Sequence, residues 1–108
     1  MNVVFLASAE ADLKEIKAYV VNKFGKDVWA EGYQEIKTVL TRVGDGTIAG
    51  KIPSELLDIH IKKYRQVLTS MNKIIYEVID ETVYIHIICD QRRDFATLLL
   101  NRLFRTPN

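Results

Sequence analysis

The fold of this chain is set by residues 73–89, KIIYEVIDETVYIHIIC. They contain two runs rich in β-branched and aromatic residues, Lys73 to Ile79 and Thr82 to Cys89, which are typical of strands. Asp80-Glu81 separates the two runs and is typical of a turn, so this stretch predicts a β-hairpin. The shorter run Tyr64 to Leu68 predicts a further strand just before it.

The N-terminal residues predict a strand followed by a helix. Val3 to Leu6 is a short apolar run, typical of a buried strand. Ser8 is expected to cap a first helix that ends at Gly25. The apolar residues of this helix recur at steps of three and four, which predicts one apolar stripe: Ala9, Leu13, Ile16, Val20 and Phe24.

A second helix is expected to start near Asp27 and to end at Gly44 and Gly46. The connection to the first helix is so short that the two helices should form an antiparallel αα-hairpin. We expect the aromatic residues of both helices to pack in the core. The apolar stripe of the second helix consists of Trp29, Tyr33, Ile36, Leu40 and Val43.

The remaining segments are a long irregular stretch and a final helix. Within residues 44–62, Pro53 to Leu57 predicts a short helical turn. Gln91 to Arg105 predicts the last helix, with Arg102 and Arg105 reaching solvent. The leucines of this helix that should face the sheet are Leu98, Leu99 and Leu103.

This order of elements predicts one α+β domain over residues 1–108. Its parts are an N-terminal strand, an antiparallel αα-hairpin, a mainly antiparallel sheet of about four strands and a C-terminal helix. We expect the helices on one face of the sheet, a groove beside the hairpin and one open sheet edge.

The composition is that of an ordinary globular protein, with 48% hydrophobic and 27% charged residues. It excludes a chain that is disordered throughout, and the apolar runs are too short for a membrane span. Cys89 is the only cysteine, so neither a disulfide framework nor a Cys-based zinc site is expected. We expect a cytoplasmic protein without a cofactor or metal ion.

Charge is distributed unevenly along the chain. Residues 1–59 carry 7 Lys and Arg against 9 Asp and Glu, whereas residues 60–108 carry 8 against 5. If the partner is anionic, its binding surface should therefore lie in the C-terminal half.

Standard catalytic motifs are absent from the sequence, including Gly-rich phosphate loops and His/Cys sets with metal spacing. His86 lies on a strand, where it is either a hydrogen-bonded or solvent-side residue or a general base. The run Asp90-Gln91-Arg92-Arg93-Asp94 places two arginines before the last helix. These arginines either present forked donors to a phosphate or carboxylate, or form an Arg–Asp network that pins the helix to the sheet.

Several strings resemble the RelE/ParE superfamily of small bacterial toxins from type II toxin–antitoxin pairs. The resemblance covers nearly the whole chain, and it implies the same α+β fold and a hetero-oligomer with a cognate antitoxin. The strings are Ala9–Asp12–Leu13–Ile16–Tyr19, Lys73 to Asp80, and Arg92-Arg93-Asp94 followed by Leu98-Leu99 and Arg102-Leu103.

The superfamily includes two activities. RelE-type members are ribonucleases that cut messenger RNA in the ribosome, whereas ParE-type members are non-catalytic poisons of DNA gyrase. In the alignment to the RelE pattern, Leu99 occupies the position of a functional tyrosine, and leucine cannot transfer a proton. The resemblance therefore favours a ParE-like gyrase poison, with an mRNA endoribonuclease as the alternative.

Each activity implies its own site residues. A ribonuclease would use Arg65, Lys73 and Arg93, together with His86 or Tyr64. A gyrase poison would have no catalytic residue and would contact its partner through basic side chains, and an acidic antitoxin tail would cover part of the same surface. The residues of that basic surface are Arg65, Lys73, Arg92, Arg93, Arg102 and Arg105.

Overall fold

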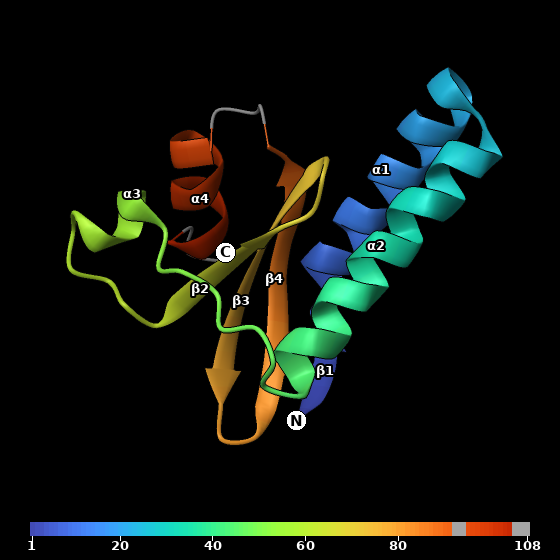
Figure 1. Ribbon diagram of the computed structural model, residues 1–108. Helices are drawn as coiled ribbons and strands as arrows, with labels where there is room; N and C mark the ends of the chain where they lie inside the picture. The colour runs from blue at the N-terminus through green and yellow to red at the C-terminus, as the bar shows by residue number, and fades with distance from the viewer. Residues whose placement is uncertain (92–94, 105–108) are drawn as a thin grey trace.

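The described part of the chain is built around a four-stranded sheet with the strand order β1-β4-β3-β2 (Figure 1). The computed structural model describes residues 1–91 and 95–104. Strands β2, β3 and β4 are antiparallel neighbours, and β1 pairs with β4 in parallel. The predicted α+β fold with a mainly antiparallel sheet is confirmed. The strands are β1 (Asn2–Phe5), β2 (Tyr64–Leu68), β3 (Asn72–Ile79) and β4 (Thr82–Asp90).

The predicted hairpin is formed by β3 and β4, which pair from Asn72↔Asp90 to Ile79↔Thr82. The pairing contains one β-bulge, because Ile75 pairs with Ile87 and the next pair is Tyr76 with Ile85. His86 is therefore an extra residue in β4. Each side chain after it lies on the opposite face of the sheet from the one that regular alternation would give.

The helices are α1 (Ala7–Phe24), α2 (Lys26–Gly44), α3 (Ser54–Leu57) and α4 (Phe95–Leu103). Gly25 joins α1 to α2 with a φ of 96°, which glycine adopts without strain. The prediction that Ser8 caps α1 is wrong, because the helix begins at Ala7 and the capping position is Leu6. Gln91 was predicted to open the last helix but lies in a turn, where its N–H donates to the carbonyl of Met71.

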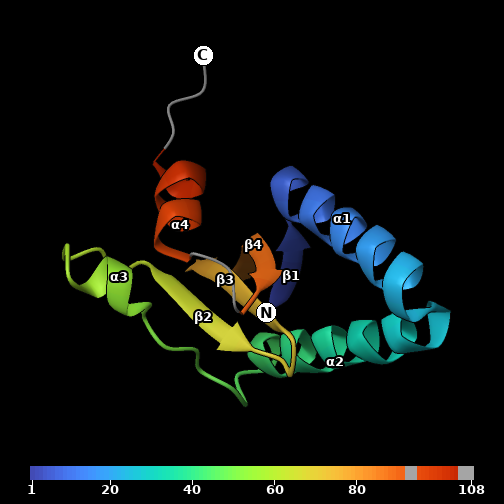
Figure 2. The same ribbon diagram turned by 90° about the horizontal axis from the view of Figure 1, so that it is seen from above.

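The helices cover both faces of the sheet, so the expectation that they lie on one face is wrong. Figure 2 shows α1 and α2 on one side and α3 and α4 on the other. The reason is that β3 and β4 carry adjacent apolar residues, Ile74-Ile75 and Ile87-Ile88, which point to opposite faces and require cover on both.

The face under α1 and α2, here called the hairpin face, carries the larger core cluster. The opposite face, here called the α4 face, carries the second cluster. The buried residues of the hairpin face are Ala9, Ile36, Leu40, Val43, Val67, Ile74, Tyr76, Val83, Ile85 and Ile88. Those of the α4 face are Leu56, Tyr64, Ile75, Ile87, Cys89, Phe95 and Leu99.

The aromatic residues of the hairpin are less buried than we expected. Trp29 and Tyr33 are half-buried and stack with ring centroids 5.3 Å apart. Phe24 is 51% exposed, so its predicted place in the core is wrong. Figure 2 shows the hairpin diverging from the sheet toward its tip, so residues near the tip pack less closely against the strands.

Within the described residues, the search for membrane spans found no helix with the length and apolar character that crossing a bilayer requires.

Candidate functional site

The structure distributes the sequence-predicted basic residues over both faces of the sheet. Arg65 is exposed and pairs in register with Tyr76, whose side chain belongs to the hairpin face. Lys73 lies on the α4 face, where its Nζ is 4.0 Å from the centre of the Phe95 ring. Arg65 and Lys73 therefore do not converge on one point. The other predicted arginines of this set, Arg92, Arg93 and Arg105, lie outside the described residues.

His86 and Glu77 form a pair on the α4 face. The Nε2 atom of His86 is 3.0 Å from Oε1 of Glu77, and their side chains are 20% and 16% exposed. The ring of Tyr64 meets the His86 ring edge-on, with centroids 5.2 Å apart. An imidazole, a carboxylate and a phenol at these distances have the groups needed to transfer a proton. Glu77 was missed from the sequence because it reaches His86 diagonally across the hairpin rather than directly opposite.

Arg102 reaches solvent only in part, with 24% of its side chain exposed, because it forms an ion pair with Asp12 of α1. Its Nη1 donates to Oδ1 of Asp12 at 2.8 Å, and its Nη2 donates to the carbonyl of His86 at 3.0 Å. Oδ2 of Asp12 accepts the backbone N–H of Ile88 at 3.0 Å. An Arg–Asp contact between Arg102 and Asp12 thus joins the last helix to α1 and, through Ile88, to the sheet. The network predicted for Arg92, Arg93 and Asp94 lies outside the described residues.

This ion pair protects the outer edge of β4. Strand β1 pairs with β4 only up to Phe5↔Ile85, so the outward-facing backbone groups after Ile85 have no neighbouring strand in the described chain. Arg102 binds the carbonyl of His86, and Asp12 binds the N–H of Ile88. A buried or half-buried edge needs such partners, since unpaired backbone groups are costly.

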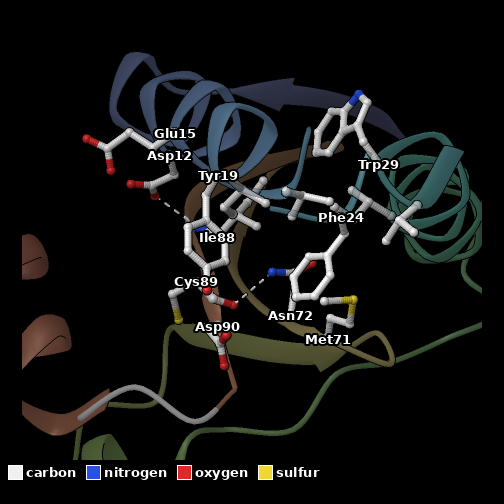
Figure 3. A pocket seen from close by; sticks show the side chains of 15 residues that line it. Asp12, Glu15, Tyr19, Phe24, Trp29, Met71, Asn72, Ile88, Cys89 and Asp90 are labelled. Atoms are coloured by element: carbon white, nitrogen blue, oxygen red, sulfur yellow. Dashed lines mark hydrogen bonds between the residues drawn. The ribbon is translucent and has the colours of Figure 1, made fainter. Parts of the chain in front are cut away.

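The groove that we expected beside the hairpin is present as a pocket of about 220 Å³ between the hairpin and the ends of β3 and β4 (Figure 3). Its walls are mainly apolar and aromatic, and its rim includes the carboxylates of Asp12, Glu15 and Asp90. No Lys or Arg is among the described residues that line it. The residues that line the pocket are Asp12, Glu15, Ile16, Tyr19, Val20, Phe24, Val28, Trp29, Gly32, Ile36, Met71, Asn72, Ile88, Cys89 and Asp90.

The acidic character of this pocket was not expected from the sequence. Asp12 and Glu15 lie three positions apart on α1, which puts them on the same side of that helix. Asp90, at the end of β4, joins them only through the tertiary fold. A helical wheel of α1 could have found the first two carboxylates beside the apolar stripe, but no local signal points to the third.

Metal chemistry finds no support in the described part of the chain. Among residues 1–91 and 95–104, no three His, Cys, Asp or Glu side chains lie close enough together to hold a metal ion. The two candidate sites are therefore the His86–Glu77 pair on the α4 face and the apolar pocket with its acidic rim under the hairpin.

Comparisons with known proteins agree with this geometry. A protein-family model described as "ParE toxin of type II toxin-antitoxin system, parDE" matches residues 3–95. Among solved structures, the chain is similar to one titled "Chromosomal ParDE TA system from P. aeruginosa", with a TM-score of 0.66 and 17% sequence identity. That match covers 83% of this chain and 95% of the other, and at this identity it shows a shared fold. The search of curated proteins found no match.

Proposed function

Because the chain belongs to the ParE toxin family of type II toxin–antitoxin systems, we propose that it arrests growth by poisoning DNA gyrase and that a cognate antitoxin neutralises it. In this proposal the protein acts by binding rather than by catalysis. Its target and its antitoxin are cytoplasmic, so the protein acts there.

The separation of the basic residues supports a binding role. A ribonuclease needs a base, an acid and a cation around one phosphate. Arg65 lies on the hairpin face, whereas Lys73 and His86 lie on the α4 face. Leu99, at the position of the RelE-type tyrosine, is 1% exposed and packs in the α4-face core. Spread over two faces, the described cations suit contact with a protein surface better than a reaction at one phosphate.

A ribonuclease remains the second candidate function, because the His86–Glu77 pair favours it. The two side chains are in hydrogen-bond contact, and the Tyr64 ring lies beside them. Such a pair could take a proton from a 2′-hydroxyl and return it to the leaving oxygen. The cation for the phosphate could be Lys63, whose Nζ lies 5.1 Å from the centre of the Tyr64 ring, or Lys73 on the same face.

One experiment separates the two functions. The purified chain is added to a gyrase supercoiling assay and, separately, to a translation extract in which transcript ends are mapped. We expect inhibited supercoiling with accumulation of cleaved DNA, and intact transcripts. Transcripts cut at defined positions, together with unaffected gyrase, would instead establish the ribonuclease.

The antitoxin is tested by co-expression with the neighbouring short reading frame. A tag on the toxin should recover both proteins, and growth should be restored. We expect the antitoxin to carry an acidic segment for the basic C-terminal half of this chain. Recovery of the toxin alone, without restored growth, would contradict the toxin–antitoxin proposal.

A further inference from the structure

The edge strand β2 is bordered by four exposed cations, here called the edge row. Strand β2 ends the sheet on the side away from β1 (Figure 1). Lys62 and Lys63 come directly before the strand, and Arg65 is its second residue. Lys51 lies against the strand from outside, because it forms an antiparallel bridge with Gln66. The edge row consists of Lys51, Lys62, Lys63 and Arg65, and all four residues are exposed.

The fold holds Lys51 beside β2 by hydrogen bonds on both sides. The N–H of Lys51 donates to the carbonyl of Gln66 at 3.0 Å, and the N–H of Gln66 donates to the carbonyl of Lys51 at 2.7 Å. The preceding residue, Gly50, donates its N–H to the hydroxyl of Tyr76 at 2.8 Å. A Cβ at Gly50 would lie 2.6 Å from the carbonyl oxygen of Gln66, so glycine is needed for this close approach. Lys51 is thus placed at this edge by its neighbours.

The charge of the edge row is not neutralised by described carboxylates. Among the described residues, no ion pair includes a member of the row. Glu77 pairs in register with Tyr64 at the start of β2, but its carboxylate is already bound to His86. The row is therefore a positive strip along one edge of the sheet.

Protection of the sheet edge does not account for this strip. Lysines on an edge strand prevent it from pairing with another chain. Strand β2 has less need of them, because Lys51 already binds both outward-facing backbone groups of Gln66, the middle residue of the strand. Four cations at an edge that is already covered indicate a binding surface.

The length and composition of the row fit a phosphodiester backbone. Strand β2 has five residues and therefore spans about 13 Å, a length over which one strand of DNA carries about four phosphates. Three of the four cations are lysines, which bind phosphates as point charges but are depleted from protein–protein interfaces. Successive phosphates also suit cations in a row, whereas a reaction at one phosphate would require them to converge.

We propose that the edge row contacts the phosphodiester backbone of the DNA that gyrase holds. The inference rests on the proposed function, because it takes gyrase as the target. Contacts with the enzyme hold the chain near the DNA, which raises the effective concentration of phosphates at the row. The chain therefore binds the gyrase–DNA complex in preference to free gyrase, and it poisons the enzyme that is engaged on DNA.

The test measures the affinity of the purified full-length chain for gyrase with and without a bound DNA duplex. The wild-type chain should bind the gyrase–DNA complex at least tenfold more tightly than free gyrase. The double variant Lys62→Glu/Lys63→Glu should lose most of this gain and keep the wild-type affinity for free gyrase. Its melting temperature should stay close to that of the wild type, because both lysines are exposed.

The matched control is the double variant Lys14→Glu/Lys17→Glu. Both lysines are exposed on α1, which packs on α2, β1 and β4. The control changes the net charge by the same amount as the test variant. It should keep the DNA-dependent gain to within about twofold, because its charges lie away from the DNA.

Salt dependence reports how many phosphates the row contacts. The logarithm of the affinity should fall more steeply with the logarithm of the salt concentration for the gyrase–DNA complex than for free gyrase, by about 0.9 for each phosphate contact. Lys51→Gln and Arg65→Gln each remove one cation and should each reduce this slope by about 1. An unchanged slope in both variants would show that neither residue contacts a phosphate.

The outcomes separate the inference from the proposed function. A DNA-dependent gain and a salt slope that survive in Lys62→Glu/Lys63→Glu would overturn the inference and leave gyrase as the target. If this variant instead loses affinity only for the antitoxin, the row binds the acidic segment of the antitoxin and the DNA contact is wrong. A wild-type chain that neither binds nor inhibits gyrase would overturn the proposed function, and the inference with it.

Discussion

Arg102 and Asp12 lie 90 positions apart in the sequence, yet a hydrogen bond of 2.8 Å joins Nη1 of the arginine to Oδ1 of the aspartate. The same two side chains bind the carbonyl of His86 and the N–H of Ile88 on β4. One ion pair thus connects α1, β4 and α4 at the place where β1 has ended. Removing Arg102 takes one donor from Asp12 and one from the carbonyl of His86, and removing Asp12 takes an acceptor from Arg102 and from the N–H of Ile88.

We expect Asp12→Ala to lower the free energy of unfolding by about 1–3 kcal/mol, because Nη1 of Arg102 and the N–H of Ile88 both lose the carboxylate that accepts from them. Glu10→Ala, an exposed carboxylate of the same helix, should change it by less than about 0.5 kcal/mol. Urea unfolding of Asp12→Ala, Arg102→Ala and the double variant measures the coupling between the two side chains. Strictly additive losses would show that the pair contributes nothing.

His86→Ala and Glu77→Gln should leave growth arrest intact, because a gyrase poison uses no proton transfer at these side chains. Both side chains are partly exposed, so the variants should fold. Growth after induction and mapped transcript ends are the two readouts. If either folded variant loses growth arrest while the wild type cuts RNA, the ribonuclease becomes the better account of the protein.

Leu99→Ala should cost about 2–5 kcal/mol of unfolding free energy, because Leu99 is 1% exposed in the α4-face core. Leu100→Ala is the matched control: the neighbouring leucine is 51% exposed, and its truncation should cost less than about 1 kcal/mol. Thermal melting followed by circular dichroism compares the two. Equal losses would mean that α4 packs with a different face on the sheet.

Asp45 makes stability depend on pH in the acid range. The hydroxyl of Thr47 and, with a smaller effect, its backbone N–H donate hydrogen bonds to the Asp45 carboxylate. These bonds hold the pKa of Asp45 below its ordinary value of 3.8. Because the folded-state pKa is lowered, the stabilisation is complete above pH 3.8 and is lost as the pH falls through the folded-state pKa. Asp45→Ala should therefore melt below the wild type at pH 7, and the two melting curves should converge toward pH 2. A difference that persists unchanged at pH 2 would contradict this assignment.

Element order and type were predictable from the sequence, because the strands and helices have clear periodicities. The hairpin from residues 73–89 formed as expected, with its turn at Asp80-Glu81. What periodicity could not predict is the extra residue at His86. Regular alternation after Ile85 would place Ile88 on the α4 face, whereas the bulge places it on the hairpin face.

The candidate sites were harder to predict, because both depend on contacts distant in sequence. Asp12 was part of a helical pattern on α1 and Arg102 part of another on α4, and neither pattern shows that the two side chains meet. The helical spacing of apolar residues also predicted Phe24 in the core, but Phe24 is exposed. Local spacing cannot show that the hairpin tip extends past the strands. The groove was expected from the hairpin itself, but its acidic rim required the position of Asp90.

The parallel pairing of β1 with β4 has a consequence for the order of events during synthesis. Phe5 is made 80 residues before Ile85, its partner in the sheet, an interval of about 4–16 s at a rate of about 5–20 residues per second. Both helices are complete once Gly44 has been made, about halfway through that interval, and from then on their apolar sides have no β4 to pack against. The nascent chain therefore passes through a stage with an exposed helical hairpin, and the domain closes only when its first and last strands meet.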